Sequence, residues 1–275
     1  TSIEVKSNNP RLVRALKTLS TISNLNFYPR ISLISSFVAP KFYNLKAIAW
    51  LFIHLYKSRY LKGLGLKAWR QSKESITIFS YLFNLDARRL KSNEHYSNFW
   101  TNLPNSIVKT GYGMNWLHIF TPSKQIPNAK TAASYLKNFN EQNSKEVHVF
   151  LESFINLRII LKSISDWYKV SKIASKLKRS LPKDDFIFNV LVDDWGKSFY
   201  GFHAINNCLT LNLFSEAMRS LPTQKLGLYL QENQSWEIAL NYCWKDSDHQ
   251  EIIGVPHSTT RFWDLRYAND HRIHN

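Results

Sequence analysis

The sequence predicts an α/β fold, because short runs of β-branched and aromatic residues alternate with segments of helical periodicity. This alternation favours a parallel sheet built from βαβ units. The first of these runs, Ser75–Phe83, is typical of a buried strand that is followed by a loop. Strands are expected at Ser75–Phe83, Met114–Phe120, Glu146–Leu151, Leu226–Leu230 and Glu251–Val255.

Helices are predicted between these strands from apolar residues spaced three and four positions apart. A long aromatic segment, Phe186–Leu221, is also expected to be helical and to be interrupted near Gly196 and Gly201. The other helices are expected at Tyr96–Lys109, Ala129–Phe139, Phe154–Leu181 and Ser235–Lys245.

This pattern divides the 275 residues into four parts. Residues 1–75 are a basic amphipathic segment, and residues 76–185 form a first Rossmann-like lobe. Residues 186–222 are a helical connector, and residues 223–275 begin a second lobe. Since the second lobe would hold only two strands, we expect it to be truncated.

The composition excludes some protein classes and points to an anionic partner. With 44% hydrophobic and 14% aromatic residues the chain is too apolar for a disordered tail, and with 20% charged residues it is too charged for a multi-span membrane protein. Its 36 Lys and Arg against 20 Asp and Glu give a formal charge of +16. Two cysteines 35 residues apart predict no disulfide framework, which fits a cytoplasmic location.

The first 75 residues carry 13 basic and 2 acidic side chains. No apolar run there is long enough to span a bilayer, because Pro40 and Lys46 interrupt it. We therefore expect Trp50, Phe52 and Leu55 to lie on an anionic membrane surface, on the inner face of the plasma membrane. The alternative is a basic helix pair that packs on the rest of the chain.

A first polar loop, Gln231 to Gln234, follows the strand expected at Leu226–Leu230. Glu232 is a candidate catalytic carboxylate, and Asn233 and Glu237 are candidate substrate ligands. Two alternatives stay open. Glu232 could be a loop acid bonded to the next helix, and Glu237 could stabilise the positive start of that helix.

A second polar loop follows Pro256 and suits an anion. Hydroxyl groups, arginines and free backbone N–H groups can hold a phosphate, while His257 can donate to it or act as an acid or base. If the last two strands are neighbours in the sheet, both loops face one cleft. The alternative is that this loop only caps a helix. The candidate donor ligands here are Ser258, Thr259, Arg261, Asp264 and Arg266.

Other titratable residues are interpreted as structural. Asp193 and Asp194 would diverge by about 100° on a helix and lack a third ligand, so no metal site is predicted. His118 and His148 fall within expected strands and are interpreted as core residues.

Two strings near the end of the chain, LYLQENQSWE (Leu228–Glu237) and IGVPHSTTRFWDLRY (Ile253–Tyr267), resemble a family of bacterial surface-carbohydrate (O-antigen) biosynthesis proteins. Weaker similarity extends back to Phe79–Asp86, and residues before 75 do not carry it. Proteins of this family are regarded as glycosyltransferases. The resemblance implies a GT-B-like architecture of two Rossmann-like lobes and a nucleotide-sugar donor, of the CMP-linked kind that carries Kdo or a nonulosonic acid.

The resulting hypothesis is transfer of a sugar onto a surface glycan or its lipid-linked precursor. The second loop would hold the donor phosphate, so that no metal or cofactor is required. Glu232, or a carboxylate such as Asp86 or Glu152, would assist the acceptor hydroxyl. Alternatives are a different nucleotide-sugar enzyme or a membrane-associated scaffold. A nucleic-acid-binding module is less supported, because no recognisable binding motif is present.

Overall fold

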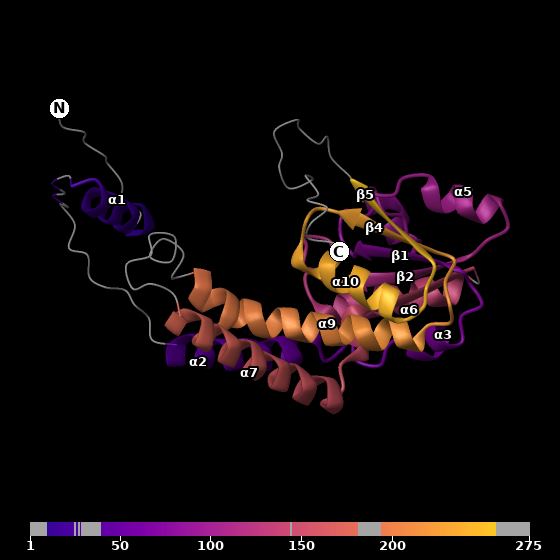
Figure 1. Cartoon of the computed structure of the whole chain (residues 1–275). Helices are drawn as coiled ribbons and strands as arrows, with labels where there is room; N and C mark the ends of the chain where they lie inside the picture. The colour runs from indigo at the N-terminus through magenta and orange to yellow at the C-terminus, as the bar shows by residue number, and fades with distance from the viewer. Residues whose placement is uncertain are drawn as a thin grey trace. The chain divides into compact units, whose positions relative to one another are not determined.

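The computed structural model has one five-stranded parallel sheet, which confirms the α/β class. It describes residues 10–24, 26, 28, 40–143, 145–180 and 194–256. The strands are β1 (Ile76–Tyr81), β2 (Met114–Ile119), β3 (Glu146–Phe150), β4 (Leu226–Gln231) and β5 (Glu251–Pro256). Their order is β3-β2-β1-β4-β5, and all neighbouring strands are parallel (Figure 1). All five predicted strands are therefore present.

The expected second sheet is not found in the described residues, because β4 pairs with β1. This pairing runs from Ile76 opposite Leu226 to Phe79 opposite Tyr229. Gln224, just before β4, contributes to this pairing of β4 with β1. Its buried side chain accepts hydrogen bonds from Thr77 Oγ1 at 2.8 Å and Asn115 Nδ2 at 3.1 Å. Strands assigned to two lobes therefore form one Rossmann-like sheet.

Ten helices connect and flank these strands in the part of the chain that carries element labels. They are α1 (Pro10–Ile22), α2 (Pro40–Ser58), α3 (Leu66–Arg70), α4 (Ala87–Lys91), α5 (Leu103–Lys109), α6 (Ala129–Gln142), the 3₁₀ helix η1 (Leu151–Phe154), α7 (Leu157–Ser180), α9 (Phe202–Ser220) and α10 (Ser235–Asp246). Residues 194–199 are also helical, and the helical structure is interrupted at Gly201, as expected.

The helix predicted at Tyr96–Lys109 is shorter than expected and begins at Leu103. Thr101 has a φ angle of 46°, in the left-handed region that helices do not use. Pro104 then occupies the first turn of α5, where a missing N–H costs no hydrogen bond. Apolar periodicity continued across this break, and the sequence pattern did not reveal it.

The chain divides into two compact units, with boundaries that differ from the four predicted parts. One unit comprises residues 1–53 and 163–208, and the other comprises residues 54–162 and 209–275 and contains the sheet. Within the first unit, Ser171 Oγ donates to the Phe199 carbonyl at 2.7 Å. This bond joins the helical residues 194–199 to α7.

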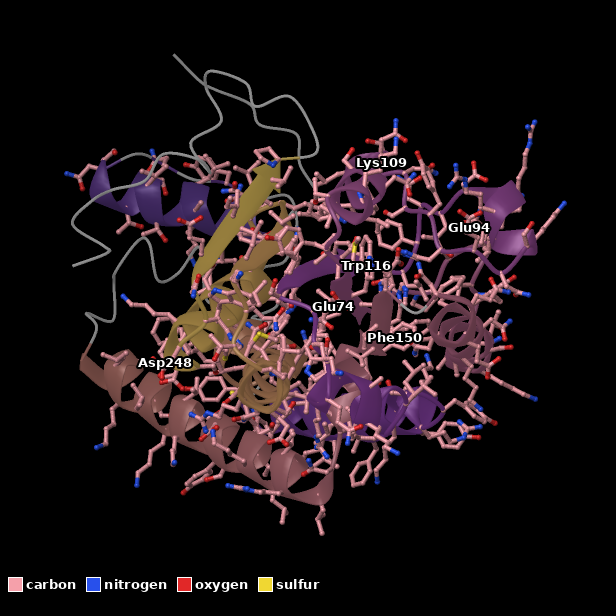
Figure 2. All side chains as sticks on the ribbon, turned by 90° about the vertical axis from the view of Figure 1, so that its right-hand side faces the viewer. Glu74, Glu94, Lys109, Trp116, Phe150 and Asp248 are labelled. Atoms are coloured by element: carbon pink, nitrogen blue, oxygen red, sulfur yellow. The ribbon has the colours of Figure 1, made fainter. Side chains whose placement is uncertain are left out.

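The core of the sheet unit lies on both faces of the sheet. On one face, Trp116 and Ile78 pack with Leu228 and Leu230 of β4. On the other face, the Phe79 ring contacts Phe214 of α9 and Trp244 of α10, with ring centroids 6.4 Å and 5.8 Å away. Figure 2 shows Trp116 and Phe150 within this packed interior, whereas Glu94 and Lys109 lie toward its margin.

Candidate functional site

The candidate site lies where the order of strands reverses, between the carboxyl ends of β1 and β4. In open parallel sheets the loops diverge at this position and leave a crevice for ligands. β1 ends at Tyr81, and β4 ends at Gln231, directly before Glu232. We define the switch-point site as Tyr81, Phe83, Glu232 and Trp236.

A tyrosine hydroxyl joins the two sides of the switch-point site. Tyr81 Oη accepts a hydrogen bond from Trp236 Nε1 at 2.8 Å and is hydrogen-bonded to the Glu232 side chain. Burial raises the pKa of Tyr81 to about 12, and the negative charges of Glu232 and Glu237 add to this effect. The phenol therefore stays protonated, so its hydroxyl is the donor in the bond to the half-buried Glu232 carboxylate.

Aromatic rings form a wall beside this carboxylate. The Tyr81 and Phe83 rings stack with centroids 5.0 Å apart, and both side chains are half-buried. Trp236 contacts the Tyr81 ring edge-on at 5.9 Å. Ring faces of this kind can pack against a sugar or a nucleobase.

Glu237 holds the shape of the loop that carries Glu232. Its buried Oε1 accepts from the backbone N–H groups of Glu232 at 2.9 Å and Gln234 at 2.8 Å. These bonds favour the helix-start alternative for Glu237 over direct contact with a donor. The exposed Asn233 has a φ angle of 60°, which asparagine tolerates better than most residues.

The second polar loop leaves the sheet beside the first. Gln231 and Pro256 are register partners in adjacent strands, so Glu232 and residue 257 follow paired positions. The predicted condition for one cleft, that the last two strands are neighbours, is therefore met. His257, Ser258, Thr259, Arg261, Asp264 and Arg266 lie outside the described residues.

Asp86 has a structural role at the start of α4. Its Oδ1 accepts from the backbone N–H groups of Arg88 and Arg89, both at 2.9 Å. The bond from Arg89 is the main cause that lowers the pKa of Asp86. This N-cap leaves Asp86 a poor candidate for a base at the acceptor.

Glu152 is a buried carboxyl at the carboxyl end of β3. It is 5% exposed, and its Oε2 has no hydrogen-bond partner among the described residues. Burial raises the pKa of Glu152 to about 7, opposed in part by backbone hydrogen bonds that include the one at Phe120. Folding therefore favours the protonated form of Glu152.

We expect Glu152 to make the protein less stable as pH rises. Because the folded pKa is raised from 4.5 to about 7, the folded state keeps a proton that the unfolded state releases above pH 4.5. The free energy of unfolding should therefore fall by about 2–3 kcal/mol as the pH rises from 5 to 8. Urea unfolding of wild type and Glu152→Gln at both pH values checks this.

The comparison with Glu152→Gln isolates the titration of Glu152, because both proteins contain His95 and His118. In either protein alone, these two histidines change the stability with pH in the opposite sense. Burial lowers the pKa of both histidines, so their contribution to stability is lost as pH falls below their ordinary range. Glu152→Gln should gain stability relative to wild type as pH rises. An unchanged difference between pH 5 and pH 8 would contradict the assignment.

One group of three possible metal ligands is found in the described part of the chain, and it does not include Asp194. It consists of His95, His118 and His148, whose ligand atoms all lie within 4.8 Å of one another. No spacing in the sequence indicates this group, because the three histidines are 23 and 30 residues apart. The pairing of β2 with β3 brings His118 and His148 together, and the segment between α4 and α5 adds His95.

A pocket of about 510 Å³ lies away from the switch-point site. Gly65 and Asn140 are among its lining residues, and Lys67 and Lys137 give it a basic character. Both Asn140 side-chain groups bond to the backbone of His148, so the pocket lies along the outer edge of β3.

Comparison of the chain with family models, with curated proteins and with solved structures finds no match in any of the three. The resemblance to surface-carbohydrate biosynthesis proteins therefore stays a prediction.

Proposed function

We propose that this chain is a glycosyltransferase that takes a sugar from a nucleotide-sugar donor. The observation that carries the proposal is the pairing of Gln231 with Pro256, after which the two polar loops begin side by side at the ligand-binding edge of the sheet. One loop carries a carboxylate for the acceptor, and the other carries hydroxyl groups and arginines for a phosphate.

Glu232 acts as the base in this proposal. An acceptor hydroxyl attacks the anomeric carbon of the donor sugar, and its proton passes to the Glu232 carboxylate. The bond between that carbon and the phosphate oxygen breaks, and the phosphate leaves with the electron pair. His257, Ser258, Thr259 and Arg261 stabilise the developing charge on the phosphate.

The aromatic wall orients the substrate. The Tyr81 hydroxyl fixes Glu232, and the half-buried Phe83 ring offers a face on which a sugar or base packs. The proposal includes a GT-B-like architecture, in which the observed sheet forms one side of the cleft and a second lobe forms the other. Asp264 and Arg266 extend the donor contacts.

The acceptor is a glycan or a lipid-linked precursor, and the proposal includes contact with an anionic membrane surface. Helix α2 exposes Leu45, Phe52 and Tyr56 at 65–68% of their surface, spaced so that they share one helix face. Lys46 and Lys57 are exposed along one flank of this face and suit anionic headgroups. No helix in the described ranges has the length and apolar character needed to cross a membrane.

Nucleotide binding tests the proposal directly. Calorimetric titration of the full chain with CMP, UDP and GDP should give saturable 1:1 binding to at least one of them. Arg261→Ala should weaken this binding by at least about tenfold, because a charge-assisted bond to phosphate is lost. Arg219→Ala is the matched control, since Arg219 is exposed and pairs with Asp246 at 2.8 Å. A chain that binds none of the three nucleotides would be a scaffold instead.

A further inference from the structure

Three histidines from separate parts of the chain meet inside the sheet unit. His118 lies near the end of β2 and His148 lies in the middle of β3, and neither has exposed surface. His95 comes from the segment between α4 and α5 and is half-buried. We call these three residues the histidine cluster.

The register of the sheet explains the contact between the two strand histidines. His148 is the register partner of Trp116, so His118 is its diagonal neighbour on the same face. His118 Nε2 lies 3.0 Å from His148 Nδ1, and the two rings are within 7° of parallel. His95 meets both rings edge-on, with centroids 5.2 Å and 4.9 Å away.

These separations suit a shared ion. Imidazole nitrogens that bind one Zn²⁺ ion tetrahedrally at 2.0–2.1 Å lie about 3.4 Å from one another. The strand pair is close to this value at 3.0 Å, and the third nitrogen is within 4.8 Å. A small rotation of the half-buried His95 side chain would close the remaining gap.

Glu146 supplies the outer contact that metal-binding histidines usually have. Its Oε2 lies 3.1 Å from His148 Nε2, and Glu146 is two residues before His148 on the same strand. A carboxylate at this position accepts a hydrogen bond from the Nε2–H group of His148. The Nδ1 atom is then unprotonated, and its lone pair points toward His118.

Aromatic side chains surround the histidine cluster. Phe139 of α6 contacts His148 and His95, with ring centroids 5.4 Å and 5.3 Å away, and Trp116 contacts His95 at 4.5 Å. The 3.0 Å contact between His118 Nε2 and His148 Nδ1 is a hydrogen bond, and a bound ion would take the place of its proton.

We propose that the histidine cluster binds one transition-metal ion of the Zn²⁺ class, with Glu146 orienting His148. Three imidazoles without a thiolate suit Zn²⁺, Cu²⁺ or Ni²⁺ rather than Mg²⁺ or Ca²⁺. The ion fastens the segment between α4 and α5 to β2 and β3. This proposal is independent of the proposed glycosyl transfer.

Metal titration of the untagged full chain tests this site. After treatment with a chelator, the protein should take up about one equivalent of Zn²⁺ or Co²⁺. The Co²⁺ form should show the visible absorption of a four-coordinate ion, and Zn²⁺ should raise the melting temperature. Mg²⁺ should do neither. Failure of the wild-type chain to bind Zn²⁺ or Co²⁺ would overturn the proposal.

Variants locate the ion within the chain. Glu146→Gln keeps the shape of the side chain and should weaken Zn²⁺ binding about 10–100-fold. His118→Ala should weaken it further, while His203→Ala, at an exposed position in the other unit, should bind as wild type does. Wild-type affinity in both Glu146→Gln and His118→Ala would also overturn the proposal.

A spectroscopic measurement decides the matter if His118→Ala does not fold. X-ray absorption of the Zn²⁺-loaded wild-type chain should show three imidazole ligands at about 2.0 Å. Fewer than two imidazoles would place the ion outside the histidine cluster and refute the assignment.

Discussion

Replacement of Glu232 by glutamine is expected to lower the turnover of sugar transfer by about 10²–10⁴-fold. The amide keeps the shape of the side chain and can still accept the hydrogen bond from Tyr81, but it cannot take a proton from the acceptor. The release of nucleotide from its sugar donor, followed by chromatography, measures the effect. This prediction rests on the proposed function.

Two comparisons separate a catalytic role of Glu232 from a structural one. Nucleotide affinity and melting temperature should stay at wild-type values, since Glu232 is half-buried and acts on the acceptor. Glu251→Gln is the matched control. Glu251 is exposed at the amino end of β5, whereas Glu232 follows the carboxyl end of the neighbouring strand β4. Turnover in Glu232→Gln within threefold of Glu251→Gln would remove Glu232 from the mechanism.

Replacement of Trp69 by alanine is expected to lower the free energy of unfolding by about 3–5 kcal/mol. Trp69 of α3 has no exposed surface, and its Nε1 donates to the Ala217 carbonyl of α9 at 3.0 Å. Its ring also contacts Phe154 at 6.1 Å. The substitution removes a large apolar side chain and one of the two hydrogen bonds that the Ala217 carbonyl accepts, the other coming from Ser220 Oγ at 3.1 Å. Urea unfolding measures the loss.

Trp69→Phe distinguishes the two parts of this effect. It keeps most of the ring volume and removes the hydrogen bond, so it should cost about 1–3 kcal/mol. Tyr112→Ala, at a 48% exposed aromatic residue in the same unit, should change stability by less than about 0.5 kcal/mol. A loss below 1 kcal/mol in Trp69→Ala would show that α3 is not fastened through this residue.

The positions of the strands were predictable from the sequence because the signal is local. A short run of β-branched and aromatic residues indicates a strand wherever it lies in the sheet, and each of the five runs became a strand within a few residues of its predicted bounds. The loop at the carboxyl end of β4 was also predictable, since it follows its run directly. Which strand pairs with which was not, because pairing is chosen by contacts between distant residues.

Gln224 and the histidine cluster illustrate this limit. Nothing near Gln224 in the sequence indicates that its side-chain oxygen accepts hydrogen bonds from Thr77 and Asn115, yet these bonds join the start of β4 to β1 and β2 in one sheet. The prediction of His118 and His148 as core residues was correct about their burial. It missed His95, which lies in the segment between α4 and α5 and reaches the other two histidines only through the tertiary fold.

The sequence by itself determined the α/β class, the strands, the basic amino-terminal segment and the acidic loop that carries Glu232. Each of these depends on residues that are close together in the chain. Only the tertiary structure decided that Trp236 donates a hydrogen bond to Tyr81, which is bonded to Glu232 in turn. It also decided that Glu237 accepts a hydrogen bond from the backbone of this loop. It also brought the histidines together. These arrangements depend on sheet order and side-chain packing, which join residues far apart in sequence and leave no periodic trace in it.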